Sequence, residues 1–150
     1  MVTSQPAGQA RALGPDGLVD ALVQAAFVTM AVLNKVGADH DLSLTQLRVL
    51  AILRDRRLRM TALADYLGLE KSTMTGLVDR AEKRGLLERA PSASDGRAVD
   101  VFLSPSGAEL AGRLYVQVRK SLSPMLNELA PAEQHRLQTL LERMLGPRES

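Results

Sequence analysis

Residues 71–107 read KSTMTGLVDRAEKRGLLERAPSASDGRAVDVFLSPSG, and the period of the apolar residues changes within this stretch. Its first part has apolar residues at helical spacing, namely Met74, Leu77, Val78 and Ala81, and Gly85 closes the run. Two short β-prone runs then bracket a segment rich in Pro, Ser, Asp and Gly. The stretch therefore predicts a helix from about Lys71, followed by a β-hairpin with strands at 86–89 and 99–103.

Two helices are predicted before it. Apolar residues recur at helical spacing over about 17–36, and Gly37 offers a stop. Ser43 and Gln46 then form a capping-box pattern, in which each side chain satisfies a backbone amide of the other residue. This pattern begins a second helix, which we expect to end near the basic cluster at 54–59.

A short third helix completes the region before Lys71. Thr61 is its candidate N-cap, the helix continues through Leu67, and Gly68 predicts a tight turn. The resulting order is helix, short helix, turn, helix and hairpin, which is the order of a winged helix-turn-helix domain. We place this domain at about 43–103.

The region after the hairpin predicts two more helices. Ser104 followed by Pro105 is an N-cap with a first-turn proline, and Pro124 predicts a kink or break. A last helix begins at Pro131, and we expect it to bury its apolar residues: Leu137, Leu140, Leu141, Met144 and Leu145. The fold class is thus mainly α with a small β-hairpin wing, and the helices at about 17–37 and 104–146 lie outside the winged domain.

Composition sets the broad class. The chain has 150 residues, of which 45% are hydrophobic and none is cysteine. This suits one globular domain, over residues 17–150, without disulfides or thiolate metal sites. Residues 1–16 are polar and rich in small residues, so we expect a flexible arm rather than a signal peptide. No run of 18 apolar residues occurs, so we expect a cytoplasmic protein without a membrane span.

Charge is unevenly distributed. The whole chain carries a net charge of only +2, but the segment from Arg48 to Arg97 holds 11 basic residues against 7 acidic ones. A basic centre between mildly acidic ends indicates an anionic partner. Much of this charge would be ordinary solvated surface in any protein. The basic cluster 54–59 and the pair Lys83 and Arg84 are therefore expected to be mainly solvated.

The predicted helix from Lys71 and the hairpin have the chemistry of a double-stranded DNA-binding surface. Small polar side chains at the start of a helix allow its backbone to approach the major groove, and their hydroxyls can bond phosphates or base edges. At the hairpin tip, an arginine can reach the minor groove or backbone, and we expect Asp95 to hold the guanidinium of Arg97 by a charge-assisted bond. The candidate DNA contacts are Lys71, Ser72, Thr73, Thr75, Asp95 and Arg97.

Three segments resemble the MarR family of bacterial transcription regulators. They are LTQLRVLAIL (44–53), MTALADYLGLEKSTMTGLVDRAEKRGLLER (60–89) and SDGRAVDVFLSPSG (94–107), and the resemblance extends over about 18–145. It implies a homodimer built from the first and last helices, a pseudo-palindromic operator, and repression relieved by a small aromatic or phenolic ligand. It also implies DNA contacts from Ser72, Thr73, Thr75 and Arg97.

Two positions depart from the family pattern or lack an explanation. Many members carry an arginine where this chain has Gly76, so base specificity cannot simply be transferred. We expect a packing or backbone-approach reason for this glycine. Glu70, just before the helix, is a poor cap and unfavourable beside DNA.

Asp79 and Arg80 match a family motif, and we expect them to pair within the chain rather than to read bases.

Other functions have less support in the sequence. The chain lacks the common nucleophile, phosphate-loop and zinc-protease motifs, so we expect no enzyme, no catalytic residue and no cofactor. His40, between two aspartates, is expected to be a hydrogen-bonded loop residue rather than a metal ligand. Phe27, Met30 and Tyr115 could line a ligand pocket, but core packing is the simpler interpretation. The main alternative function is a winged-helix protein-interaction module without specific DNA binding.

Overall fold

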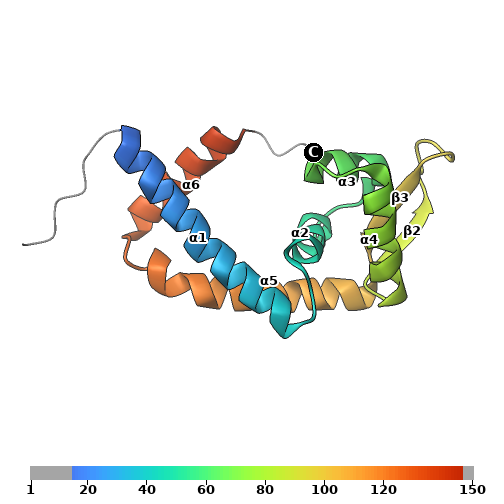
Figure 1. The fold of residues 1–150 in the computed structure, drawn as a ribbon, viewed down its shortest axis with the longest axis horizontal. Coiled ribbons are helices and arrows are strands. Elements are labelled where there is room, and N and C mark those ends of the chain that lie inside the picture. The colour runs from blue at the N-terminus through green and yellow to red at the C-terminus, as the bar shows by residue number, and fades with distance from the viewer. Residues whose placement is uncertain (1–14, 147–150) are drawn as a thin grey trace, which may run out of the picture.

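The computed structural model describes residues 15–146. They form a chain of helices interrupted by one small sheet (Figure 1). In chain order the elements are α1 (Pro15–Asp39), α2 (Leu44–Leu53), β1 (Leu58–Arg59), α3 (Met60–Leu67), α4 (Lys71–Lys83), β2 (Leu87–Pro91), β3 (Val99–Leu103), α5 (Pro105–Leu126) and α6 (Pro131–Leu145). The mainly helical fold with a hairpin wing is confirmed. The expected arm at 1–16 lies almost wholly outside the described residues.

The sheet is antiparallel, and β3 lies in its centre in the order β1-β3-β2. In β2, Leu87 pairs with Leu103, and in β1, Leu58 pairs with Val101. The strand predicted at 99–103 is confirmed, whereas β2 begins one residue and ends two residues later than the predicted strand at 86–89. The two-residue strand β1 was missed, because the sequence there was interpreted only as the basic end of α2.

The hydrophobic core lies inside the winged domain. Its most deeply buried side chains come from α2, α3, α4 and the sheet: Val49, Leu63, Met74, Val78, Leu87 and Val101. The first half of α5 closes the core with Leu110, Ala111 and Leu114. Burial of these side chains fixes α4 by one face, because its apolar stripe must point inward. The opposite face of α4 is left to solvent.

Capping and glycine patterns in the sequence predicted most helix ends correctly. The amide of Gln46 donates to Ser43 Oγ over 3.1 Å and the amide of Ser43 donates to Gln46 Oε1 over 2.8 Å, which confirms the capping box. Gly68 ends α3 in the left-handed region, at φ 65°. The proposed cap at Thr61 is wrong, because α3 already begins at Met60 and its N-cap residue makes no side-chain bond.

The two outer helices, α1 and α6, are poorly covered within one chain. The apolar residues expected to be buried in α6 are exposed, from 37% for Leu141 to 79% for Leu145, and α6 contains no buried residue. Large apolar side chains in the first half of α1 are also exposed: Leu18, Val19, Leu22, Val23, Phe27 and Val28. The burial predicted for α6 is therefore wrong for the single chain.

Neither of the two helix breaks expected from the sequence occurs at the predicted residue. Pro124 does not interrupt α5, which continues to Leu126 and ends there. Gly37 does not end α1. A Cβ at Gly37 would lie 2.8 Å from the carbonyl oxygen of Leu42, so this glycine allows the following loop to fold back closely.

By length and composition alone, Asp16–Asp39 in α1 could also cross a membrane, and none of that apolar window is buried.

Candidate nucleic-acid interface

The N-terminal end of α4 presents a free polar surface. Lys71, Ser72 and Thr73 are exposed, whereas Met74 and Leu77 hold the other face of the helix in the core. The N-cap residue Glu70 makes no side-chain hydrogen bond to the first amides of α4. The first turn therefore combines small hydroxyls, a lysine and amides without a side-chain cap, an arrangement that suits phosphate oxygens and base edges.

Thr75 is less available than the other predicted contacts. Its hydroxyl donates to the carbonyl oxygen of Lys71 over 2.9 Å, and the residue is only partly exposed. This bond to the preceding turn uses the single hydroxyl proton, so Thr75 could offer DNA only its oxygen lone pairs. The structure thus separates Thr75 from Ser72 and Thr73, which make no hydrogen bond of this kind.

The tip of the wing lies between β2 and β3. Asp95 Oδ1 accepts a hydrogen bond from the backbone amide of Arg97 over 3.0 Å. The expected contact between the Asp95 carboxylate and the guanidinium is therefore wrong, because the carboxylate closes the turn instead. The side chain of Arg97 is exposed and makes no ion pair within residues 15–146, so it remains free to contact a polyanion.

An ion-pair cluster joins the wing to α4. Arg89 in β2 lies 2.8 Å from Asp79 and 2.7 Å from Glu82, both on α4. The hydrogen bond that Arg89 Nε donates to the Glu82 carboxylate is the largest cause that raises the pKa of the Arg89 guanidinium, and the charge of Asp79 adds to it. The expected pairing is thus confirmed for Asp79 and wrong for Arg80, which makes no ion pair in the described chain. Arg89 was not predicted as a site residue.

The basic cluster after α2 supports the wing from its other side. Arg59 in β1 donates to Ser94 Oγ over 2.7 Å. Arg57 lies 4.0 Å from the centroid of the Phe102 ring and 3.8 Å from Asp100. These arginines were predicted to be mainly solvated, yet two of them contact the hairpin. They add positive charge beside the wing and connect it to the start of α3.

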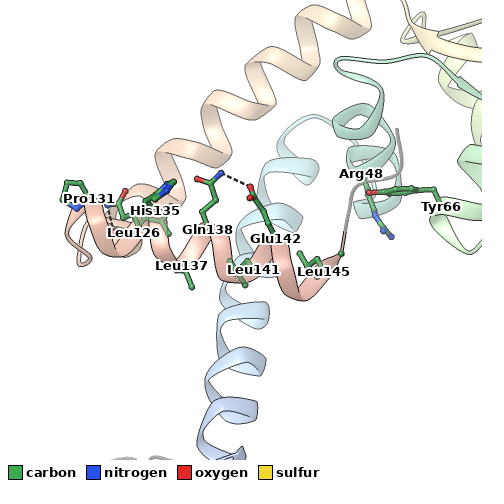
Figure 2. A pocket seen from close by; sticks show the side chains of 12 residues that line it. Arg48, Tyr66, Leu126, Pro131, His135, Leu137, Gln138, Leu141, Glu142 and Leu145 are labelled. Atoms are coloured by element: carbon green, nitrogen blue, oxygen red, sulfur yellow. Dashed lines mark hydrogen bonds between the residues drawn. The ribbon is translucent and has the colours of Figure 1, made fainter.

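A second feature lies away from this surface. A wide opening of about 1440 Å³ separates α6 from the start of the winged domain. Arg48 and Tyr66 lie on one side of it, and His135, Gln138 and Leu141 on the other (Figure 2). The opening exceeds the usual size of a small-molecule pocket, which is about 300–1,000 Å³.

The other predicted candidates fall near α5. His40 is hydrogen-bonded to Gln117 Oε1 at 2.9 Å, and the described residues contain no metal-binding cluster. Tyr115 is half exposed beneath the guanidinium of Arg54, 4.2 Å from the ring centroid. Phe27 and Met30 are exposed on α1, so the core interpretation is wrong for all three of Phe27, Met30 and Tyr115 within one chain.

Comparison with known proteins finds similarity to bacterial transcription regulators. Residues 40–98 match the MarR family. The HTH-type transcriptional regulator YfiV of Bacillus subtilis is 34% identical over 94 residues, which are 62% of this chain and only 59% of that relative. The homoprotocatechuate degradative operon repressor of Escherichia coli is 25% identical over 87% of this chain and 89% of its own. The crystal structure of NadR with 4-hydroxyphenylacetate superposes with a TM-score of 0.74 at 21% identity, over 95% and 99% of the two chains.

Proposed function

We propose, from the match of residues 40–98 to the MarR family, that the chain is a member of this family and acts as a homodimeric, sequence-specific DNA-binding transcriptional repressor. Its relatives are HTH-type transcriptional regulators rather than enzymes. In our proposal α4 enters the major groove of a pseudo-palindromic operator and the wing reaches the neighbouring minor groove or backbone. Double-stranded DNA is thus the principal partner, and the protein acts in the cytoplasm.

The observation that carries this proposal is the combined surface of α4 and the wing. Lys71, Ser72 and Thr73 are exposed on α4, and Arg97 is exposed on the wing. Arg89 joins the two elements through α4 carboxylates. A DNA-binding module needs such a rigid relation, because its helix and wing must meet two grooves in one register. We assign Lys71, Ser72, Thr73 and Arg97 as direct contacts, Thr75 as an acceptor only, and Asp95 as the residue that shapes the tip.

Dimerisation is proposed from the outer helices. The apolar side chains of α1 and α6 are exposed in one chain, which is unusual for large contiguous apolar surface on a soluble monomer. A second copy that covers them would complete the core of this half and would fill part of the opening beside Arg48 and Tyr66. The apolar character of α1 then serves subunit association rather than a membrane span.

A small aromatic or phenolic ligand is proposed as the effector. Support comes from two similar proteins, the homoprotocatechuate degradative operon repressor and NadR, which was crystallised with 4-hydroxyphenylacetate. We assign no residues to the ligand site. A melting temperature raised by 4-hydroxyphenylacetate, together with weaker operator binding, would support this part of the proposal.

The primary test measures binding of the purified protein to the DNA upstream of its own coding region and to unrelated DNA of equal length, across a salt titration. We expect tighter binding to the upstream DNA, two chains per site by light scattering, and affinity that falls steeply with salt. Equal and weak binding to both DNAs, followed by no enriched sequence after selection from random DNA, would reject the proposal and favour a protein-interaction module. A monomer that needs detergent to stay in solution would reject the dimer.

A further inference from the structure

Gly76 lies in the middle of the solvent-facing side of α4. The inward side of the helix is formed by Met74, Leu77 and Val78, so position 76 points away from the core. Among residues 15–146, a Cβ built at Gly76 would meet only one neighbour within 4 Å, the Nη1 atom of Arg80 at 3.4 Å. The packing or backbone-approach reason that the sequence suggested for this glycine is therefore not found in the part of the chain that the structure describes. Glycine is unfavourable within a helix, so its reason must lie elsewhere.

Arg80 occupies the space that Gly76 leaves open. Long helical side chains lean toward the helix N-terminus, and the guanidinium of Arg80 accordingly lies over the turn that contains Gly76. Arg80 is exposed, and no hydrogen bond or ion pair engages its side chain within residues 15–146. Its charge is thus held on the outward surface, one turn nearer to the hydroxyls of Ser72 and Thr73 than its own backbone position.

The acidic neighbours of Arg80 are already engaged. Asp79 and Glu82 both lie against Arg89, at 2.8 and 2.7 Å. Without Arg89, the adjacent carboxylates would compete for the Arg80 guanidinium and draw it toward the protein. The pairing across to β2 therefore leaves Arg80 as a free planar donor on the surface that faces DNA.

We propose that Arg80 is a specificity-determining residue that reads a G·C pair in the major groove, by bonding guanine O6 and N7 across the bare turn at Gly76. The inference rests on the proposed DNA-binding function. A guanidinium suits this contact because its two parallel N–H groups match the two guanine acceptors. The missing side chain at position 76 serves both partners, since it lets the helix backbone approach the groove and gives the guanidinium room to lie flat.

The test selects binding sites from a pool of random double-stranded DNA with four proteins: wild type, Arg80→Ala, Arg80→Lys and Lys83→Ala. Lys83 is the matched control, an exposed cation on the same face about one turn further along. We expect wild type to enrich a symmetric motif with a strongly preferred G·C pair in each half-site. Arg80→Ala should lose the preference at that pair alone, and Arg80→Lys should not restore it. Lys83→Ala should keep the whole motif.

Affinity measurements then separate base reading from phosphate binding. Each protein is titrated with the selected DNA and with the same DNA carrying A·T at the preferred pair. Arg80→Ala should weaken binding to the selected DNA by roughly 5- to 150-fold per half-site and leave the A·T version nearly unchanged. Gly76→Ala should raise the melting temperature, because alanine favours a helix, and yet weaken binding to the selected DNA.

The outcomes distinguish the two levels of the proposal. If wild type enriches no motif, the proposed function and this inference both fail. If wild type enriches a motif that Arg80→Ala enriches unchanged, the function stands and the inference is overturned. Equal losses by Arg80→Ala on both DNAs would assign Arg80 to a phosphate and would also overturn base reading.

Discussion

Replacement of Gly107 by alanine tests the junction between the wing and α5. A Cβ at Gly107 would lie 1.9 Å from the carbonyl oxygen of Leu86 and 2.9 Å from its carbonyl carbon, both backbone atoms. The same oxygen accepts the amide of Ser104 at 3.0 Å, and Ser104 Oγ accepts the amide of Gly107 at 2.9 Å. The contact cannot be relieved by a side-chain rotation, so one backbone must move by roughly 1.5 Å to reach an ordinary contact distance.

The expected cost follows from these contacts. Overpacking of a rigid site costs about 1–3 kcal/mol, and loss of the N-cap bond adds about 1 kcal/mol. The better helix propensity of alanine returns about 0.5–1 kcal/mol, so we expect a net loss of about 1–3.5 kcal/mol. For a chain of this size that corresponds to a melting temperature lower by about 2–14 °C.

Thermal unfolding followed by circular dichroism, at one fixed protein concentration, measures this loss. Gly112→Ala is the matched control, because Gly112 lies in the same helix and a Cβ there would meet no atom of the described residues within 4 Å. The control should be neutral or slightly stabilising. If Gly107→Ala melted within 1 °C of wild type, the close approach of α5 to Leu86 would be refuted.

Four further changes test separate parts of the molecule. Arg97→Ala should weaken operator binding by about 1–3 kcal/mol per half-site without lowering the melting temperature; equal affinity would remove the wing tip from the interface. Arg89→Met should cost only about 1 kcal/mol of stability, since its ion pairs are partly exposed, but should weaken DNA binding because the wing is no longer held to α4; unchanged binding would show that the wing is positioned by other contacts. Ser43→Ala should lower stability by about 1 kcal/mol in denaturant titrations and leave DNA affinity intact. Leu140→Glu on α6 should convert a dimer into a monomer by light scattering, and a dimer that persists would exclude α6 from the interface.

Features encoded by neighbouring residues could be predicted from the sequence. Ser43 with Gln46 and Ser104 with Pro105 each specify a helix start within four residues, and both starts are present. The alternation in 99–103 specified β3 within the correct bounds. These signals depend on local geometry alone, which is why they identified the winged order and the outward face of α4.

Features that depend on distant partners could not be predicted in the same way. Arg89 becomes part of the interface only because β2 lies beside α4, and nothing in its own neighbourhood indicates Asp79 as its partner. Strand β1 exists only through its pairing with β3, some 40 residues later. Asp95 accepts a hydrogen bond from the backbone amide of Arg97 rather than from its guanidinium, because an aspartate side chain in a turn bonds the backbone two residues later.

The structure also suggests how the two halves of the molecule are connected. The first part of α5 belongs to the core of the winged domain, through Leu110 and Leu114, whereas its later part lies with α1 and α6 (Figure 1). At the other end of α4, Arg84 donates to the carbonyl oxygens of His40 and Asp41 in the loop after α1, at 3.0 and 2.8 Å. Helix α4 is thus attached to the outer helices at two places, through the core side chains of α5 and through the Arg84 side chain on the loop after α1. In the proposed dimer, a change in how α1 and α6 pack would therefore move α4 as a rigid unit. Such a movement would alter the distance between the two recognition helices, which must match the spacing of the two operator half-sites.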